Sequence, residues 1–330
     1  MRKTVCATLA VMMSVLFSPL SQAGQAWESY KARFFKPEGR IVDTGNGGVS
    51  HTEGQGFAML MAVANDDKAT FDKLWQWTNR ELKNKENGLF YWRYNPAESN
   101  PVADKNNAAD GDVLIAWALL KADARWHEKR YGAASDAITK ALVAHSVIRY
   151  AGYRVMLPGA QGFKLDGEVV LNPSYFVFPA WQAFAGRSHL PVWRDLIKDG
   201  KRLLGKMGSG KANLPTDWVS LASSGKLEPA KGWPPRMSYD AIRIPLYLAW
   251  SDKQSPLLAP WKAWFGQFPR EQTPAWVNVT TNEYAPYMME GGLLAVRDLT
   301  MGQSSGEPEI TSKDDYYSAS LKMLVWISAQ

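Results

Sequence analysis

Three long apolar stretches, each with an acidic residue at its head, constrain most strongly what this chain can fold into. Glu53 precedes the apolar residues 54–64, Asp110 and Asp112 precede residues 113–120, and Asp240 precedes residues 241–250. A helix that is apolar on every side is buried in a protein and does not lie at its surface. We therefore predict three buried helices, each presenting an acid where it emerges into a cleft.

Further helical segments alternate with these buried ones, and several are apolar on one face only. They are predicted at residues 27–35, 68–82, 133–148, 172–181, 192–207, 261–268, 288–299 and 318–328. Between them we predict a long loop at 83–107 with short strands near 90–94, a hairpin within 149–171, and loops at 208–237. The predicted class is all-α, with about eleven or twelve helices in a closed double ring. The alternative, an α-solenoid, requires a repeat of fixed period, and none is visible.

The first 23 residues are typical of a secretory signal peptide. Arg2 and Lys3 precede an apolar run from Val5 to Phe17, and residues 21–23 (SQA) resemble a cleavage site. A membrane anchor is the alternative, but the run is shorter than the roughly 20 residues that span a bilayer. We expect residues 24–330 to form one catalytic domain, secreted across the inner membrane to the periplasm or the outside, with no anchor after cleavage.

Composition excludes several classes of site and partner. The only cysteine, Cys6, lies in the predicted signal, so disulfides and thiolate metal sites are not expected in the mature chain. The four histidines lack zinc-protease spacing; no metal or cofactor is expected, although an all-oxygen calcium site stays open. Loss of Arg2 and Lys3 lowers the net charge from +6 to +4, and no basic run exceeds two residues, which argues against nucleic acid.

The acids at the helix heads are the candidates for chemistry. Burying a carboxylate is costly unless it is paired or protonated, and neighbouring carboxylates raise one another's pKa. A cleft that gathers Glu53, Asp110, Asp112 and Asp240 can keep one of them protonated and another ionised, as glycoside hydrolysis requires. Asp110 and Asp112 also suit helix capping. For Asp112 we favour capping or support over direct catalysis, whereas glutamate is a poor capping residue.

Several segments resemble glycoside hydrolase family 8. Residues 108–126 (AADGDVLIAWALLKADARW) are similar to its signature, with Ala109 where serine or threonine is usual. Residues 52–56 (TEGQG) resemble its general-acid segment, and residues 238–243 (SYDAIR) resemble its general-base segment. Residues 172–175 (NPSY) and 217–219 (DWV) extend the likeness, which runs from about residue 27 to residue 326. The resemblance implies an (α/α)6 barrel and an inverting endo-1,4-β-glucanase that needs no cofactor.

The resemblance also implies roles for individual residues. Glu53 becomes the general acid, Asp240 the general base, and Asp110 a residue that holds and distorts the central sugar. The carboxyl groups of an inverting pair lie roughly 6.5–9.5 Å apart, which leaves room for the attacking water. Tyr239 is expected to orient that water, and Arg243 to pair with a carboxylate. A buried salt bridge with no catalytic part is the alternative for Arg243.

Aromatic residues are the candidates for stacking on glucose units. With Asp112, they complete the expected substrate-binding set: Trp92, Tyr175, Trp233, Tyr316 and Tyr317. Each alone is more typical of a core, but Trp92 and Trp233 lie in polar segments. The expected substrate is a β-1,4-glucan, and similarity to a periplasmic cellulase of this family allows a functional association with cellulose synthase. A lichenase, a xylanase, a chitosanase and a non-catalytic glucan-binding protein stay open as alternatives.

Overall fold

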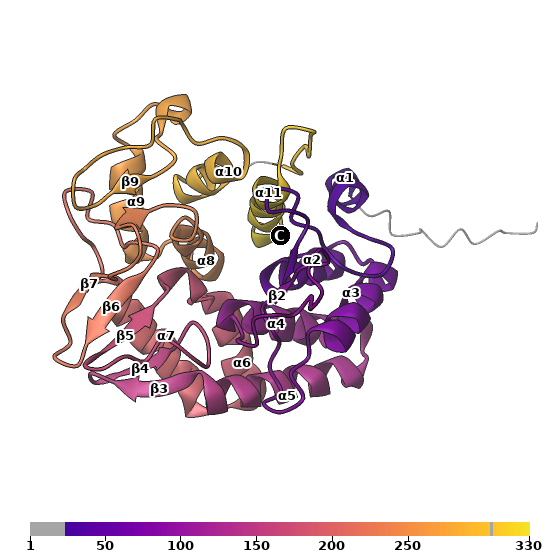
Figure 1. The fold of residues 1–330 in the computed structure, drawn as a ribbon. Coiled ribbons are helices and arrows are strands. Elements are labelled where there is room, and N and C mark those ends of the chain that lie inside the picture. Colours follow the sequence, from indigo (N-terminus) through magenta and orange to yellow (C-terminus); the bar gives the residue numbers. More distant parts are fainter. Residues whose placement is uncertain (1–23, 304–305) are drawn as a thin grey trace, which may run out of the picture.

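The computed structural model describes residues 24–303 and 306–330 (Figure 1). The predicted signal peptide, residues 1–23, lies outside the described residues. Eleven α-helices dominate the described part of the chain. They are α1 (Gln25–Phe34), α2 (Thr52–Ala64), α3 (Lys68–Glu81), α4 (Ala109–Trp126), α5 (Lys129–His145), α6 (Phe178–Ser188), α7 (Pro191–Leu204), α8 (Arg243–Ser251), α9 (Ala259–Phe265), α10 (Gly291–Thr300) and α11 (Tyr316–Ser328).

The helices form two concentric rings. Contacts run from α2 to α4, α6, α8, α10 and α11 and back to α2, which closes an inner ring (Figure 1). Helices α1, α3, α5, α7 and α9 lie outside this ring and pack against its members. In the sixth outer position, the described residues of the segment 301–315 contain no α-helix. This architecture confirms the predicted (α/α)6 barrel.

Two glycines bring the N-terminal turns of α2 and α4 together. Both helices are buried over most of their length, as their apolar sequences predict. A Cβ atom on Gly56 would lie 2.5 Å from the Cβ of Leu114, and one on Gly111 would lie 2.1 Å from the hydroxyl of Thr52. Because neither position tolerates a side chain, the two backbones approach closely. This packing places the first turn of α2 beside the first turn of α4.

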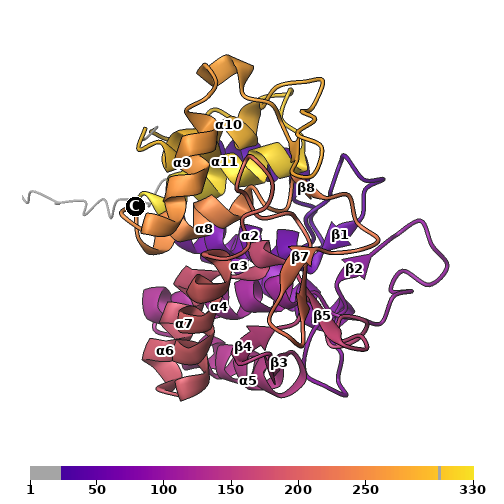
Figure 2. The same ribbon diagram turned by 90° about the vertical axis from the view of Figure 1, so that its left-hand side faces the viewer.

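Short strands gather at one end of the barrel (Figure 2). The pairs are antiparallel: β1 (Ser50–His51) with β2 (Arg93–Tyr94), β3 (Val147–Tyr150) with β4 (Tyr153–Met156), β5 (Glu168–Leu171) with β6 (Val219–Ala222), β6 with β7 (Leu227–Pro229), and β8 (Arg236–Met237) with β9 (Val277–Asn278). The β3–β4 hairpin confirms the hairpin predicted within 149–171, although it begins two residues earlier. The segment 208–237 was predicted to contain only loops, but it also contains β6, β7 and β8.

Two of the predicted helix starts that differ from the structure lie near the acids. The segment 172–181 begins with a 3-10 turn, Pro173–Tyr175, because the side chain of Asn172 accepts a hydrogen bond from the Ser174 backbone; α6 starts at Phe178. Asp240 does not lie on a helix, since residues 239–242 form a turn and α8 starts at Arg243. Among the described residues, no helix has both the length and the apolar character to cross a bilayer.

Candidate active site

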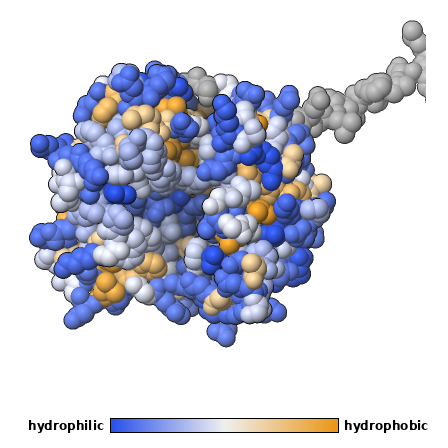
Figure 3. Space-filling view, turned by 45° about the horizontal axis from the view of Figure 1, so that its top comes forward, coloured by the Kyte–Doolittle hydropathy of each residue, from blue (hydrophilic) through white to orange (hydrophobic). Residues whose placement is uncertain are grey.

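A pocket opens at the end of the barrel where α2 and α4 begin. Its lining combines acidic, aromatic and small residues from α2, α4, the loop before α4 and the 3-10 turn: His51, Thr52, Glu53, Trp92, Ala108, Asp110 and Tyr175. The surface view shows a hollow in this part of the molecule with hydrophilic residues at its floor (Figure 3). Two of the predicted acids, Glu53 and Asp110, therefore face one pocket.

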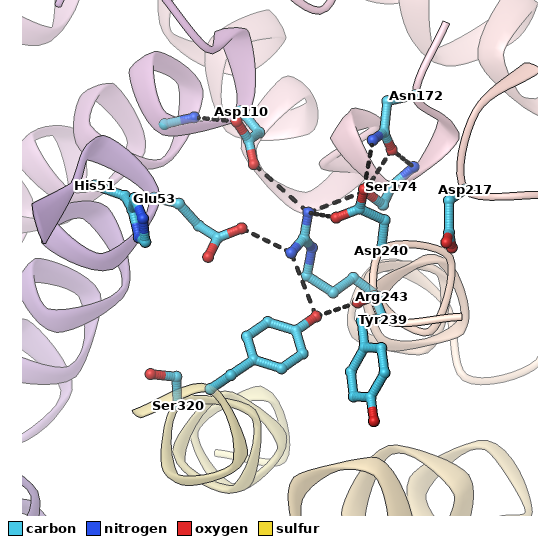
Figure 4. A network of polar contacts seen from close by, with 12 residues as sticks. His51, Glu53, Asp110, Asn172, Ser174, Asp217, Tyr239, Asp240, Arg243 and Ser320 are labelled. Carbon is cyan, nitrogen blue, oxygen red and sulfur yellow. Dashed lines mark hydrogen bonds and ion pairs between the residues drawn. The ribbon is translucent and has the colours of Figure 1, made fainter. Parts of the chain in front are cut away.

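Arg243 joins this pocket to Asp240 (Figure 4). One terminal nitrogen, Nη1, lies 2.7 Å from Glu53 Oε2, and the other, Nη2, lies 3.2 Å from Asp240 Oδ1 and 3.7 Å from Asp110 Oδ2. The side chain of Arg243 is only 4% exposed. The structure thus brings Glu53, Asp110 and Asp240 together around one buried cation.

The same contacts limit the separation of Glu53 and Asp240. Both carboxylates contact terminal nitrogens of one guanidinium, at 2.7 and 3.2 Å. A guanidinium is small and planar, so the Glu53 and Asp240 oxygens that contact it lie no more than roughly 8 Å apart. This upper limit is below 9.5 Å, the upper end of the range of about 6.5–9.5 Å for the carboxyl groups of an inverting pair. Asp240 has 33% of its side chain exposed, which leaves it open to water.

The charges in this cluster are unequal in number. Three carboxylates surround one guanidinium, so full ionisation leaves an excess of negative charge in a buried place. Burial and the charge of Glu53 raise the pKa of Asp110 to about 8, although Arg243 and the backbone N–H of Gly111 oppose the shift. A carboxyl group with such a pKa keeps its proton at neutral pH. The cluster therefore holds a proton within reach of the pocket.

Asn172 holds the carboxylate of Asp240 from the other side, and Ser174 orients Asn172. The amide nitrogen of Asn172 donates to Asp240 Oδ2 at 3.1 Å. The amide oxygen of Asn172 accepts from the backbone and the hydroxyl of Ser174, and Arg243 donates to that hydroxyl at 3.0 Å. These contacts fix which end of the amide faces Asp240. Sequence reasoning assigned neither residue a role, although polar residues at the start of an apolar stretch were a usable signal.

Asp112 does not bind substrate in this arrangement, contrary to the expectation. It is fully buried and does not line the pocket. Its oxygens accept from the backbone of Phe90 at 2.9 Å and from the side chain of Asn107 at 2.7 Å. Helix capping was wrong as well, because residue 108 is the capping position of α4 and no side chain caps it. Burial raises the pKa of Asp112 to about 7, and the carboxyl supports the loop that carries Trp92.

Two of the predicted tyrosines lie elsewhere than expected. Tyr316 is only 2% exposed, so its ring offers no stacking face; its hydroxyl donates to Glu53 Oε1 at 3.4 Å. Tyr239 is exposed, but its hydroxyl points away from the carboxylates and bonds to the hydroxyl of Tyr287 at 3.2 Å (Figure 4). In this arrangement Tyr239 is not placed to orient a water at Asp240.

Tyr175 lies in the pocket, and Tyr317 contacts the cation of the acid cluster. Tyr175 lines the pocket, and burial, followed by the charges of Asp110 and Asp240, raises the pKa of its phenol well above the ordinary value. Tyr317 is half-buried. Its hydroxyl accepts from Arg243 Nη1 at 3.3 Å and donates to the backbone carbonyl of Tyr239. Tyr317 thus connects the buried cation to the turn that carries Asp240.

The two predicted tryptophans offer partly exposed rings. Trp92 lines the pocket and lies parallel to the ring of His51, with 6.0 Å between centroids. Trp233 is 36% exposed and stacks on Trp218 at 4.9 Å, while Trp218 stacks on Phe163 at 5.7 Å. Flat rings of this kind suit the faces of sugars. His51 is a pocket residue that sequence reasoning did not select.

A metal centre has no visible basis in the residues that the structure describes. Within them, no group of three or more histidine, cysteine, aspartate or glutamate side chains has an arrangement that would hold a metal ion. Glu53, Asp110 and Asp240 contact Arg243 instead. The site contains carboxyl groups that differ in their burial, and such a set is suited to proton transfer.

Comparison with known proteins identifies the family. Residues 1–330 match the model of glycosyl hydrolases family 8. The chain is 61% identical to an endoglucanase of Cellulomonas uda (92% of this chain, 84% of that one) and 41% identical to a probable endoglucanase of Novacetimonas hansenii (92% and 90%). The crystal structure of an endoglucanase from Klebsiella pneumoniae superposes with a TM-score of 0.92 at 65% identity, covering 93% of this chain and 99% of that one. The chain therefore belongs to glycosyl hydrolase family 8.

Proposed function

We propose that this protein is an endo-1,4-β-glucanase that hydrolyses internal bonds of cellulose or soluble β-glucan with inversion at the anomeric carbon. The observation that carries the proposal is the meeting of Glu53, Asp110 and Asp240 around Arg243, beside a pocket that Glu53 and Asp110 line. The relatives at 61% and 41% identity, an endoglucanase and a probable endoglucanase, favour β-1,4-glucan over the other substrates of the family.

In the proposed reaction, Glu53 and Asp240 act on opposite faces of one sugar ring. Glu53, in the protonated form that the reaction requires, gives its proton to the glycosidic oxygen as the bond from the anomeric carbon to that oxygen breaks. A water attacks the anomeric carbon from the other face, and Asp240 takes its proton. The exposure of Asp240 and its contacts with Asn172 and Arg243 suit a base that holds a water.

Asp110 serves a third purpose in this scheme. With a pKa raised to about 8, it remains protonated at neutral pH and adds no negative charge to the cluster around Arg243. A protonated carboxyl both donates and accepts hydrogen bonds. We assign it to a hydroxyl group of the central sugar, which it would hold in a distorted conformation. Partners that strengthen in the transition state contribute several kcal/mol in glycosidases.

Aromatic rings would extend the binding site along the glucan. Trp92, parallel to His51, lies in the pocket itself. Trp233 presents one face to solvent and is supported on the other by Trp218. Both would stack on glucose units, which places them in substrate binding and not in bond cleavage.

We further propose that residues 1–23 direct secretion, that residues 24–330 form the single catalytic domain, and that the enzyme acts in the periplasm or outside the cell. A basic start, a short apolar run and small residues at positions 21–23 support this proposal. A functional association with cellulose synthase rests on the family resemblance alone. Deletion of the gene tests it, since the association predicts altered cellulose output by the producing cell.

The proposed activity is tested with residues 24–330 on carboxymethylcellulose, lichenan, xylan and chitosan. We expect reducing ends to appear fastest from carboxymethylcellulose, with a rapid fall in viscosity because internal bonds are cut. Glu53→Gln and Asp240→Asn should lower both signals to a small, still measurable level while circular dichroism stays unchanged. Binding of glucan by the wild type without release of reducing ends would contradict the proposal and favour a glucan-binding protein.

A further inference from the structure

The proposed base lies on a turn whose position depends on contacts outside α8. Residues 239–242 form this turn, and its own backbone hydrogen bonds run from Ile242 to Ser238 and from Arg243 to Asp240, each at 3.0 Å. These bonds shape the turn but do not attach it to the rest of the barrel. A general base must be held close to its productive position, since a displacement of about 1 Å costs roughly 100-fold in rate.

Asp217 attaches this turn to the neighbouring segment. Its Oδ1 accepts from the backbone N–H groups of Ser238 at 2.9 Å and Ala241 at 2.8 Å, and its Oδ2 accepts from the Ser238 hydroxyl at 2.5 Å. The two backbone contacts lie on either side of residues 239 and 240. Asp217 therefore holds the turn by hydrogen bonds to a residue before and a residue after the proposed base.

Asp217 is itself fixed by the strands around it. Its backbone N–H donates to the carbonyl of Arg236 in β8 at 2.8 Å, and β6 begins two residues after Asp217. Among the ion pairs of residues 24–303 and 306–330, none includes Asp217. Its charge is met by backbone N–H groups and a hydroxyl instead, which are effective partners for a carboxylate.

The surroundings of Asp217 also connect it to Asp240 electrostatically. Burial, followed by the charge of Asp240, raises the pKa of Asp217 to about 6, against the lowering effect of its three hydrogen bonds. The two carboxylates are thus near neighbours, although Asp217 does not line the pocket.

We propose that Asp217 is a positioning residue, which acts through Asp240 by clamping residues 238–241 so that the base faces the attacking water. The proposal rests on the assignment of Asp240 as the base. Removal of the clamp should slow the water attack and leave the aromatic contacts with the glucan in place. The loss should therefore appear in kcat and spare KM.

Two substitutions at Asp217 distinguish the effect of losing its hydrogen bonds from the effect of losing its charge. We expect Asp217→Ala to lower kcat at least about 10-fold with KM within about 3-fold of the wild type. Asp217→Asn keeps an oxygen for the two backbone N–H groups, and the Ser238 hydroxyl can accept from its amide. We expect it to restore kcat to within about 3-fold of the wild type. Ser238→Ala removes one of the three bonds, and we expect a smaller loss of kcat at unchanged KM.

Asp67→Ala is the matched control, because Asp67 also accepts a backbone N–H, that of Thr70, but caps α3 and does not line the pocket. This variant should melt at a lower temperature with kcat unchanged. A double-mutant cycle with Asp240→Asn then tests the route of action. If Asp217 acts through Asp240, Asp217→Ala adds no further loss of rate to Asp240→Asn.

Three results would overturn the proposal: a kcat for Asp217→Ala within twofold of the wild type, an equal fractional loss in the Asp240→Asn background, or no rescue by asparagine. If Asp217→Ala does not fold, Ser238→Ala tests the proposal in its place. An unchanged kcat for Ser238→Ala would then contradict the positioning role of Asp217. Wild-type activity of Asp240→Asn would instead remove the base assignment, so failure of the proposed function is read separately from failure of the clamp.

Discussion

Arg243 and Glu53 form the shortest ion pair of the site, with 2.7 Å between Nη1 and Oε2, although they come from the start of α8 and the first turn of α2. The other terminal nitrogen of the same guanidinium lies 3.2 Å from Asp240. One buried cation thus sets the positions of both proposed catalytic carboxylates. Several expected outcomes depend on this arrangement.

Substitution of Arg243 should impair catalysis and stability to different degrees. Arg243→Lys keeps the charge but loses the planar fork that reaches two carboxylates, so we expect kcat to fall at least about 100-fold. Arg243→Met also leaves the acids unpaired. We expect its free energy of unfolding at pH 7 to be lower than that of the wild type by about 3–5 kcal/mol. Steady-state kinetics and urea unfolding measure both effects. A lysine variant with more than a tenth of the wild-type kcat would show that bridging is dispensable.

Asp110 should make the stability of the protein depend on pH. Its pKa is raised to about 8, above the ordinary value of about 3.9. Between these values the unfolded chain has released the proton and the folded chain still binds it, so the free energy of unfolding falls as the pH rises from about 4 to 8. Asp110→Asn removes this dependence. We expect the variant to exceed the wild type in stability by at least about 1 kcal/mol at pH 7, with a smaller difference at pH 4.

Urea unfolding at the two pH values checks this outcome. Asp136→Asn is the control, since Asp136 is an exposed acid paired with Arg187 on the outside of the barrel. It should change stability little at either pH. An Asp110→Asn variant that is less stable than the wild type at pH 7 would show that Asp110 is ionised and favourably paired in the folded protein.

The need for Glu53 should depend on the leaving group. For a cello-oligosaccharide, the departing oxygen requires a proton, and we expect Glu53→Gln to lower kcat at least about 1,000-fold. For an aryl cellobioside whose phenol has a pKa of about 4, the oxygen leaves as an anion and the loss should be far smaller. Rates on both substrates test the acid assignment. An equal loss on both would assign Glu53 to another step.

Trp233 should contribute to binding and not to bond cleavage. Its partly exposed ring is supported by Trp218, and we expect Trp233→Ala to raise KM about 3- to 10-fold with kcat within about twofold. Trp233→Phe keeps a flat face and should recover most of the affinity. A KM of the alanine variant equal to that of the wild type would place the glucan elsewhere on the surface.

Much of the barrel was predictable because burial leaves a direct trace in sequence. The runs headed by Glu53 and Asp110 are apolar on every side, and they form the buried helices α2 and α4 of the inner ring. The strands were harder to predict because most have only two to four residues and pair with distant segments, as β5 does with β6. Such short segments carry too few residues to show a period of two.

The site was predictable in its acids and less so in its contacts. Acidic residues at the heads of apolar runs drew attention to Glu53, Asp110 and Asp240, which the fold gathers around Arg243. The same signal wrongly included Asp112 in the substrate-binding set, although the supporting role that the sequence also favoured for it is confirmed by its hydrogen bonds to Phe90 and Asn107. The hydrogen bonds of Asn172 and Asp217 join segments far apart in the chain, and no local pattern specifies which distant partner a polar side chain meets.

The configuration of the first product tests the central claim most directly. Proton NMR of a cello-oligosaccharide digest, recorded before mutarotation, distinguishes the α-anomer from the β-anomer at the new reducing end. If Glu53 and Asp240 act as acid and base on opposite faces of the sugar, the α-anomer appears first. Initial appearance of the β-anomer would mean that a carboxylate attacks the sugar directly, and would contradict the account.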